Sequence, residues 1–221
     1  MAALIQILNF GLLIFVKIKK PKKTKNSIRP LSKILIRKKV IIAILAASVG
    51  YSLMSFIMTA TPLQIVNVCK LGDNASATVI QWHVIAMFAP SFFTGSIINF
   101  LGSRKVMMIG VMLYIISICF AVMGQTIEYF WISLFLCGLG WNFLYVGGSD
   151  IIAKSALPEE RAKVQGITDF IIFIFVASGS FLAGSLHNNL GWEIMMFYTS
   201  IPIFILFLSI VFINPREIKA I

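Results

Sequence analysis

The stretch GSIINFLGSRKVMMIG, residues 95–110, places two adjacent basic side chains, Arg104 and Lys105, between two long apolar runs. The run before these side chains reaches back to about Ala77, and the run after them extends to Met123. An α-helix needs about 20 mainly apolar residues to cross a bilayer. The stretch therefore predicts a tight turn between two membrane-spanning helices, with its charges at the membrane surface.

The composition of the whole chain agrees with a membrane protein. Of 221 residues, 59% are hydrophobic and 12% are charged, and the mean hydropathy is +0.94. Soluble domains contain roughly 45–50% apolar and about 25% charged residues. No run shows the period-two alternation that is typical of a transmembrane strand. The sequence therefore predicts an all-α integral membrane protein.

Apolar runs of spanning length recur along the chain. We identify seven that can cross a bilayer as helices: 2–17, 40–60, 76–101, 106–124, 129–153, 165–187 and 193–213. The first run is short and contains Gln6 and Asn9. Because basic residues follow this run instead of preceding it, we interpret it as a retained helix and not as a signal peptide.

Lysine and arginine residues lie in alternate connections between these runs. Of the 19, 18 lie in the first, third and fifth connections or in the tail, and only Lys70 lies elsewhere. Short loops rich in lysine and arginine stay on the cytoplasmic side. We therefore predict that the N-terminus is outside and the C-terminus is cytoplasmic. The high pI, near 9.8, then reflects charges beside lipid headgroups, and nucleic acid is not an expected partner.

The first connection is a long basic linker. Within it, apolar residues recur at helical spacing among lysines and arginines: Ile28, Leu31, Ile34 and Leu35. This pattern predicts a short amphipathic helix that lies on the inner membrane surface. The later connections are short, so the linker separates one helix from a group of six.

The opening stretch resembles a loop motif of the major facilitator superfamily (MFS), G-x-x-x-D-[RK]-x-G-[RK]-[RK]. In that family the motif lies between the second and third helices of each six-helix half, and the copy in the second half is usually degraded. Three positions match and three depart: Gly95, Gly102 and Arg104 are present, whereas Asn99 replaces the acid and Phe100 and Ser103 replace basic residues. These departures favour the C-terminal half.

The layout of the chain agrees with this resemblance, and LPEERAKVQG, residues 157–166, is similar to the loop before the eleventh helix of bacterial members. The resemblance implies a sixth helix, a central loop and helices seven to twelve. The predicted organisation is a lone transmembrane helix at 1–17, a basic cytoplasmic linker at 18–39, a six-helix MFS-type half-bundle at 40–213 and a cytoplasmic tail at 214–221. Because the resemblance implies five further helices before these, we expect the chain to be a fragment, a truncated reading frame or a half that pairs with a separate N-terminal half.

The resemblance implies a secondary transporter of a small solute in the bacterial plasma (inner) membrane. Such transporters alternate access by rocking two halves around a site near the bilayer midplane. The expected partners are a small-molecule solute, a coupling proton or other ion, and the lipid bilayer. The alternative is a non-transporting membrane scaffold or a receptor-like remnant of the transporter fold.

Signatures of enzymes and of bound groups are missing from the sequence. It contains no GxxxxGK[ST] loop, no HExxH pair and no recognisable Ser-His-Asp arrangement, so neither an ATP-driven pump nor a membrane hydrolase is supported. The three cysteines, Cys69, Cys119 and Cys137, are too widely spaced for a metal or redox motif. We therefore expect a protein that is not an enzyme, with no cofactor and no metal.

Ionisable side chains inside spans are costly, and each is therefore a candidate for a functional site. Asp169 is a candidate carboxylate for proton coupling or solute binding; the alternative is a structural acid, paired at the cytoplasmic rim. His83, with Gln81 nearby, is a candidate for the solute cavity, where its imidazole can titrate. The alternative for His83 is a hydrogen-bonded position between helices.

Aromatic side chains give a second group of cavity candidates. Trp141 and Tyr145 share one face of a predicted helix at i, i+4 spacing, and the Asn142 amide lies beside them. An aromatic face with an amide suits a moderately polar organic solute, although packing between helices explains it equally well. Tyr51 and Ser55 are further cavity candidates.

The resemblance also implies a latch at the opening stretch. In the superfamily, basic residues of the loop bind an acid at the cytoplasmic end of the helix two further on. Here that acid is Asp150, so we predict that Arg104 or Lys105 lies close to it. Lys154, at i+4 on the same helix, is the local competitor for the carboxylate.

Overall fold

The computed structural model describes residues 29–212. Within this range the chain is helical and contains no strand, in the order α2 (Leu31–Leu35), α3 (Lys38–Pro62), the π-helix η1 (Leu63–Val68), α4 (Asp73–Phe88), α5 (Ser91–Leu101), α6 (Ser103–Met123), α7 (Ile127–Ser155), α8 (Arg161–Leu190) and α9 (Trp192–Val211). The helix expected at 1–17, residues 18–28 of the linker and the tail at 214–221 lie outside the described residues. The short helix expected within the linker is present as α2.

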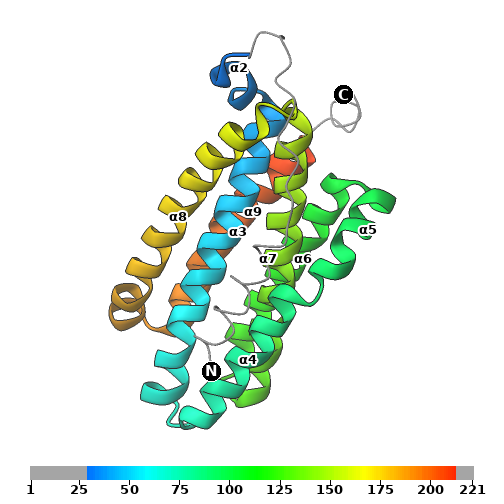
Figure 1. The fold of residues 1–221 in the computed structure, drawn as a ribbon. Coiled ribbons are helices and arrows are strands. Elements are labelled where there is room, and N and C mark those ends of the chain that lie inside the picture. The colour runs from blue at the N-terminus through cyan, green and yellow to red at the C-terminus, as the bar shows by residue number, and fades with distance from the viewer. Residues whose placement is uncertain (1–28, 213–221) are drawn as a thin grey trace, which may run out of the picture.

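The described helices form one elongated bundle of antiparallel spans (Figure 1). Five of them are long and apolar enough to cross a membrane, and α4 with α5 makes a sixth if the bent pair counts as one span. Figure 1 shows α4 and α5 following one another from one end of the bundle toward the other. This agrees with the six runs predicted between residues 40 and 213 and confirms the all-α membrane class.

The third predicted run, 76–101, is broken where the sequence predicts a continuous helix. The axes of α4 and α5 differ by 43°. Pro90 lies at the break, as the residue before α5. Proline has no backbone N–H and its ring clashes with the preceding turn, so it bends a helix at this point.

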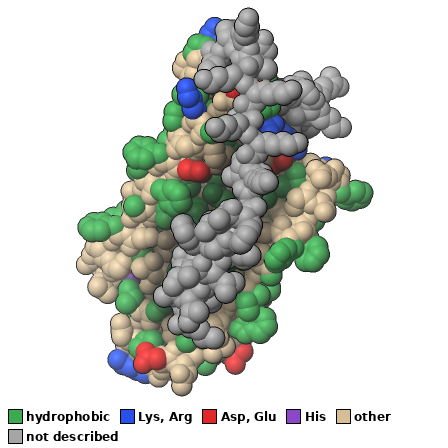
Figure 2. All heavy atoms as spheres, viewed as in Figure 1, with side chains coloured by type: hydrophobic (Ala, Val, Ile, Leu, Met, Phe, Trp, Pro, Cys, Tyr) green, Lys and Arg blue, Asp and Glu red, His purple; other side chains and the backbone are tan. Residues whose placement is uncertain are grey.

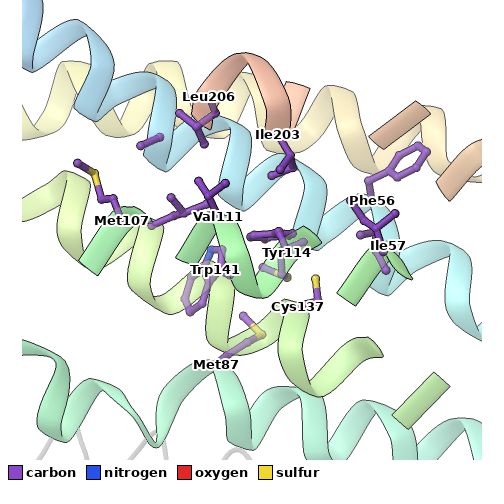
Figure 3. Packing of buried hydrophobic residues seen from close by; sticks show 14 of the residues in the cluster. Phe56, Ile57, Met87, Met107, Val111, Tyr114, Cys137, Trp141, Ile203 and Leu206 are labelled. Carbon is purple, nitrogen blue, oxygen red and sulfur yellow. The ribbon is translucent and has the colours of Figure 1, made fainter. Parts of the chain in front are cut away.

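Helix α7 is the centre of the bundle, since it packs along α3, α4 and α6. Figure 3 shows buried side chains from these helices and from α9 converging around Tyr114. Tyr114 is fully buried, and its hydroxyl donates a 2.6 Å hydrogen bond to the carbonyl of Gly50. A buried phenol needs such a partner, and here the partner also joins α6 to α3.

The most extensive helix contact, between α6 and α7, includes two glycines. A Cβ atom at Gly140 would lie 2.8 Å from the Tyr114 ring and 3.0 Å from the carbonyl oxygen of Gly110. Small residues let membrane helices approach until their backbones touch. Gly110 and Gly140 therefore bring the two helices together and fix the position of α7.

The outer surface is largely apolar, and α8 is the most peripheral long helix. In its most apolar window 17% of the residues are buried, compared with 56% in that of α7. Figure 2 shows hydrophobic side chains along the flanks of the bundle, with most lysine and arginine side chains near the end that carries α2. This distribution fits a bundle whose flanks contact lipid and whose ends reach the membrane surfaces.

Candidate functional site

Aromatic rings from four helices meet beside the central helix and form what we call the aromatic face: Tyr51, Phe88, Trp141, Tyr145 and Phe173. Trp141 and Tyr145 are stacked on α7, with centroids 5.4 Å apart and planes 9° from parallel. Tyr51 of α3 meets both edge-on, at 5.1 Å and 5.5 Å. Phe88 of α4 and Phe173 of α8 each lie 5.8 Å away, against Trp141 and Tyr51 respectively. The structure thus brings together three predicted cavity residues, Tyr51, Trp141 and Tyr145.

A carboxylate lies at the edge of the aromatic face. Asp169 of α8 is half-buried and is within electrostatic reach of the Tyr145 hydroxyl. Its Oδ1 accepts a 2.7 Å hydrogen bond from Nε2 of Gln165, one turn earlier. The ion-pair alternative finds no support, because no lysine or arginine among residues 29–212 is paired with this carboxylate. Asp169 therefore keeps capacity to accept further hydrogen bonds.

The indole of Trp141 also has an unused hydrogen-bonding group. Trp141 is 5% exposed, and its Nε1–H is buried with no acceptor in the described part of the chain. Buried indole N–H groups usually have a partner. The aromatic face thus combines stacked rings, one unpaired donor and one acidic acceptor, an arrangement that can bind a flat organic molecule with polar edges.

Asn142 does not belong to the aromatic face, and the expectation that it faces a cavity is wrong. It is fully buried, and its Nδ2 donates to the Met87 carbonyl at 2.7 Å and to Ser91 Oγ at 2.6 Å. The hydroxyl of Thr94 donates to its Oδ1 at 2.6 Å. All three partners lie at the break between α4 and α5. Because the bend leaves backbone groups in need of partners, the amide of Asn142 is used to hold the bend against α7.

His83 and Gln81 also lie elsewhere, so they are corrections to the predicted cavity. His83 is fully buried, and its Nδ1 is 2.7 Å from the carbonyl of Leu134 on α7. This is the interhelical position that was the alternative for His83. Positions two apart on a helix differ by about 200°, so the exposed Gln81 points away from α7.

Ser55 lies one turn beyond Tyr51 on the same side of α3, but it contacts α8. Its Oγ is 2.6 Å from Oγ of Ser180. A paired hydroxyl at a helix contact contributes to packing between helices in membranes. Ser55 is therefore an interhelical residue at the border of the aromatic face.

The residues predicted for the cavity do not include Phe88, Phe173 or Gln165. A signal for two of them exists, because Gln165 and Phe173 lie four residues before and after Asp169 and share its side of the helix. No such signal exists for Phe88, because its contact with Trp141 depends on how α4 packs against α7.

The motif residues of the opening stretch form the turn between α5 and α6. Gly102 is the single residue between the two helices and has φ +86° and ψ 147°, a backbone conformation that only glycine adopts without strain. Gly95 and Asn99 are exposed on α5. The match at Gly102 thus has a physical reason, and the predicted tight turn is present.

The predicted contact of Arg104 or Lys105 with Asp150 is absent from this structure. Arg104 donates from Nε to the carbonyl of Ile210 at 3.1 Å and from Nη2 to that of Val211 at 2.8 Å. Basic groups bind unpaired carbonyls at helix C-termini favourably, and this end of α9 occupies Arg104. Lys105 is exposed and makes no ion pair with a described acid.

Asp150 nevertheless lies at the turn. Its Oδ2 accepts hydrogen bonds from Ser103 Oγ at 2.5 Å and from Lys154 Nζ at 2.7 Å. Lys154 is the local competitor that the helical spacing predicts. The residue before Arg104, and not Arg104 itself, therefore joins the turn to α7 in this state.

Glu160, a second acid at the same end of the bundle as Asp150, accepts hydrogen bonds at both of its carboxylate oxygens. The carboxylate of Glu160 accepts from the backbone N–H, Nε and Nη2 of Arg29, at 3.1, 3.0 and 2.7 Å, and from the backbone N–H of Leu157 at 3.0 Å. The hydrogen bond from Arg29, more than any other contact, lowers the pKa of Glu160 from 4.5 to about 2. This contact fixes the end of the linker to the connection before α8, and sequence spacing gives no signal for it.

Metal ligands do not cluster in the described part of the chain. Residues 29–212 contain no group of three or more His, Cys, Asp or Glu side chains placed to hold a metal ion.

Comparison with known proteins agrees with this architecture. Residues 70–221 match the model of the Major Facilitator Superfamily. The chain is similar to the riboflavin transporter RfnT of Brucella anthropi, with 40% identity over 195 residues, 86% of this chain and 49% of that protein. It is 37% identical to the uncharacterised MFS-type transporter YdeG of Bacillus subtilis over 133 residues, 58% of this chain and 30% of that protein.

More distant similarity extends to a second riboflavin transporter. RibZ of Clostridioides difficile is 24% identical over 151 residues, 67% of this chain and 33% of that protein. The chain thus spans half or less of the length of these relatives. Together, the motif at the turn, the bundle of spans and the family match show that this chain is an integral membrane protein of the major facilitator superfamily.

Proposed function

We propose that this chain forms the solute-binding C-terminal half of a secondary transporter for a small, flat aromatic solute, and that riboflavin is the first such solute to test. The observation that carries this proposal is the aromatic face, with the stacked pair Trp141 and Tyr145 at its centre. The similarity to RfnT, at 40% identity, supports the choice of riboflavin.

The chemistry of the aromatic face suits a flavin ring. Aromatic rings prefer offset-stacked or edge-on contacts with one another. The rings of the aromatic face can therefore attract a further flat ring through contacts of the same kind. The unpaired Nε1–H of Trp141 is a donor for a ring carbonyl. The carboxylate of Asp169, bonded so far to Gln165, is an acceptor for an imide N–H or a side-chain hydroxyl.

Transport requires a second half-bundle, because alternating access rocks two halves around the site between them. A separate N-terminal half is therefore the proposed partner, with a proton or other ion as the coupling species. Asp169 is the proposed carboxylate for coupling, since it is ionisable and half-buried within a span. We place the protein in the bacterial inner membrane with α2 and the turn at Gly102 on the cytoplasmic side, as the basic residues favour.

Uptake of labelled riboflavin by a riboflavin-requiring bacterium tests this proposal. The chain is expressed alone and together with a complementary N-terminal half, and each strain is compared with its Trp141→Leu and Trp131→Leu variants. Trp131 is the matched control, because it lies on the same helix but stacks on Phe135, outside the aromatic face. We expect uptake with both halves, which Trp141→Leu strongly reduces at low riboflavin concentration and Trp131→Leu preserves. Flavin binding without uptake, both when the chain is expressed alone and when it is expressed with the N-terminal half, would favour the non-transporting alternative.

A further inference from the structure

A cavity of about 500 Å³, with several polar side chains in its lining, lies at the end of the bundle opposite α2, away from the aromatic face. It forms where η1, the connection between α6 and α7 and the turn between α8 and α9 meet. Its polar lining comes from Gln64, Gln125, His187, Asn188, Trp192 and Glu193. The π-helical turn at η1, which supplies Gln64, is a rare conformation that is frequent at functional sites.

A chain of hydrogen bonds runs along the lining of this cavity. His187 Nε2 is 2.9 Å from Gln64 Oε1. Gln64 Nε2 is 2.9 Å from Gln125 Oε1. Gln125 Nε2 is 3.4 Å from Glu193 Oε1. The chain therefore joins a buried imidazole to a carboxylate through two amides.

The carboxylate fixes the direction of this chain. An ionised carboxylate only accepts hydrogen bonds, so Gln125 donates to Glu193 and its own oxygen accepts from Gln64. The oxygen of Gln64 must then accept from His187, so the neutral imidazole carries its proton on Nε2. The bond from Cys69 Sγ to the same oxygen of Gln125, at 3.3 Å, agrees with this direction.

This arrangement leaves one strong acceptor unused in a buried position. His187 is 6% exposed, and its Nδ1 has no partner among residues 29–212. With the proton on Nε2, the unpaired group is a lone pair, which requires a hydrogen-bond donor. Leaving such a group buried without a partner is costly, and His187 lines a cavity large enough to admit a donor.

The charge of the cavity lining indicates the class of that donor. Glu193 is an anionic side chain in the lining, and no lysine or arginine is among the described residues that line the cavity. We propose that this cavity is a binding site for a small cation with N–H groups, of the guanidinium or primary ammonium class. The cation donates to His187 Nδ1 and is held by the charge of Glu193.

The chain offers a direct test, because it contains two histidines in all. Nitrogen-15 spectra of the full chain in nanodiscs therefore show two imidazoles. We expect His187 in the Nε2–H form and His83 in the Nδ1–H form, since Nδ1 of His83 faces a carbonyl that only accepts. Methylguanidinium should shift Nδ1 of His187 saturably and leave His83 unchanged. Methylurea, its uncharged isostere, should bind more weakly.

Two matched variants separate the cavity from general surface charge. Glu193→Gln keeps the shape of the side chain and should weaken methylguanidinium binding roughly fivefold. Glu128→Gln removes an exposed acid on the first turn of α7, outside the cavity lining, and should leave the affinity unchanged. An Nδ1–H form at His187, equal binding of methylurea, no response to methylguanidinium, or equal loss in both variants would each overturn the proposal.

Discussion

Asn142 and Trp141 are neighbours in the sequence, but they lie on different faces of α7 and have opposite surroundings. Successive residues of a helix point about 100° apart, so Asn142 faces the bend between α4 and α5 while Trp141 faces α3. Asn142 makes three hydrogen bonds to protein groups, whereas the indole N–H of Trp141 makes none to the described residues. The hydrogen-bonding groups of α7 therefore have partners on the face of Asn142, whereas one donor on the face of Trp141 has none among the described residues.

This contrast separates residues that hold the bundle together from residues that are available to a ligand. A buried polar group with every partner in place contributes to stability and has nothing to offer a solute. A group with unused capacity contributes less to stability and can gain a partner from a ligand. The substitutions below test this division, beginning with the largest effect.

Asn142→Leu should lower stability most. The substitution keeps the approximate volume but leaves the Met87 carbonyl and the Ser91 hydroxyl without the amide that binds them at the bend. We expect a loss of about 2 kcal/mol in unfolding free energy, measured by denaturation in nanodiscs. Asn99→Leu is the matched control, because Asn99 is exposed on α5. Equal losses in both variants would show that the amide of Asn142 does not hold the bend.

Asp169→Asn should affect binding and not stability. The variant keeps the shape of the side chain and the bond from Gln165 but removes the charge at the edge of the aromatic face. We expect riboflavin affinity, measured by flavin fluorescence, to fall roughly fivefold, with little change in the unfolding midpoint. Asp150→Asn, at the end of the same bundle, should leave affinity unchanged. A larger loss of riboflavin affinity in Asp150→Asn than in Asp169→Asn would mean that Asp169 is not the carboxylate that binds the solute.

Glu160 is a second group with all of its partners in place, but its partner Arg29 is partly exposed to water, so its effect should be smaller than that of Asn142. Its pKa is lowered to about 2 by Arg29, below that of an unfolded glutamate. The ionised contact therefore stabilises the fold above about pH 4.5, and this stabilisation is lost as the pH falls toward about 2.

Thermal unfolding across that pH range measures this contribution. Wild-type protein should exceed Glu160→Gln in midpoint at neutral pH, and the difference should shrink on acidification. The Arg29→Gln background supplies the control, because there the substitution at Glu160 should have little further effect. A difference that stays constant with pH would mean that the ionised carboxylate is not what fixes the linker.

The fold could be predicted from the sequence because bilayer physics constrains it strongly. Run length and the placement of lysine and arginine predict the spans, and the motif predicts the glycine turn at Gly102. The side on which each polar residue lies is harder to predict. Asn142 was expected beside Trp141 because both are close in sequence, but the bend at Pro90 places a backbone carbonyl and two hydroxyls where they bind the amide.

Contacts between residues that are far apart in the chain also cannot be predicted from sequence spacing. Arg104 carries the charge that the motif requires, but the end of α9, more than 100 residues away in the chain, provides carbonyls that bind it. The contact between Arg29 and Glu160 and the chain from His187 to Glu193 likewise join segments whose proximity depends on the packing of whole helices. Local spacing did identify the pair of Asp150 and Lys154 and the stack of Trp141 on Tyr145.

Riboflavin binding to the purified chain in nanodiscs tests the role of the aromatic face most directly. Quenching of flavin fluorescence is titrated for the wild type and for Trp141→Leu and Trp131→Leu, two substitutions of the same kind on the same helix. We expect saturable quenching that Trp141→Leu weakens about tenfold and Trp131→Leu leaves unchanged. Equal affinities in all three proteins, or a larger loss in Trp131→Leu, would contradict the assignment of the aromatic face as the solute site.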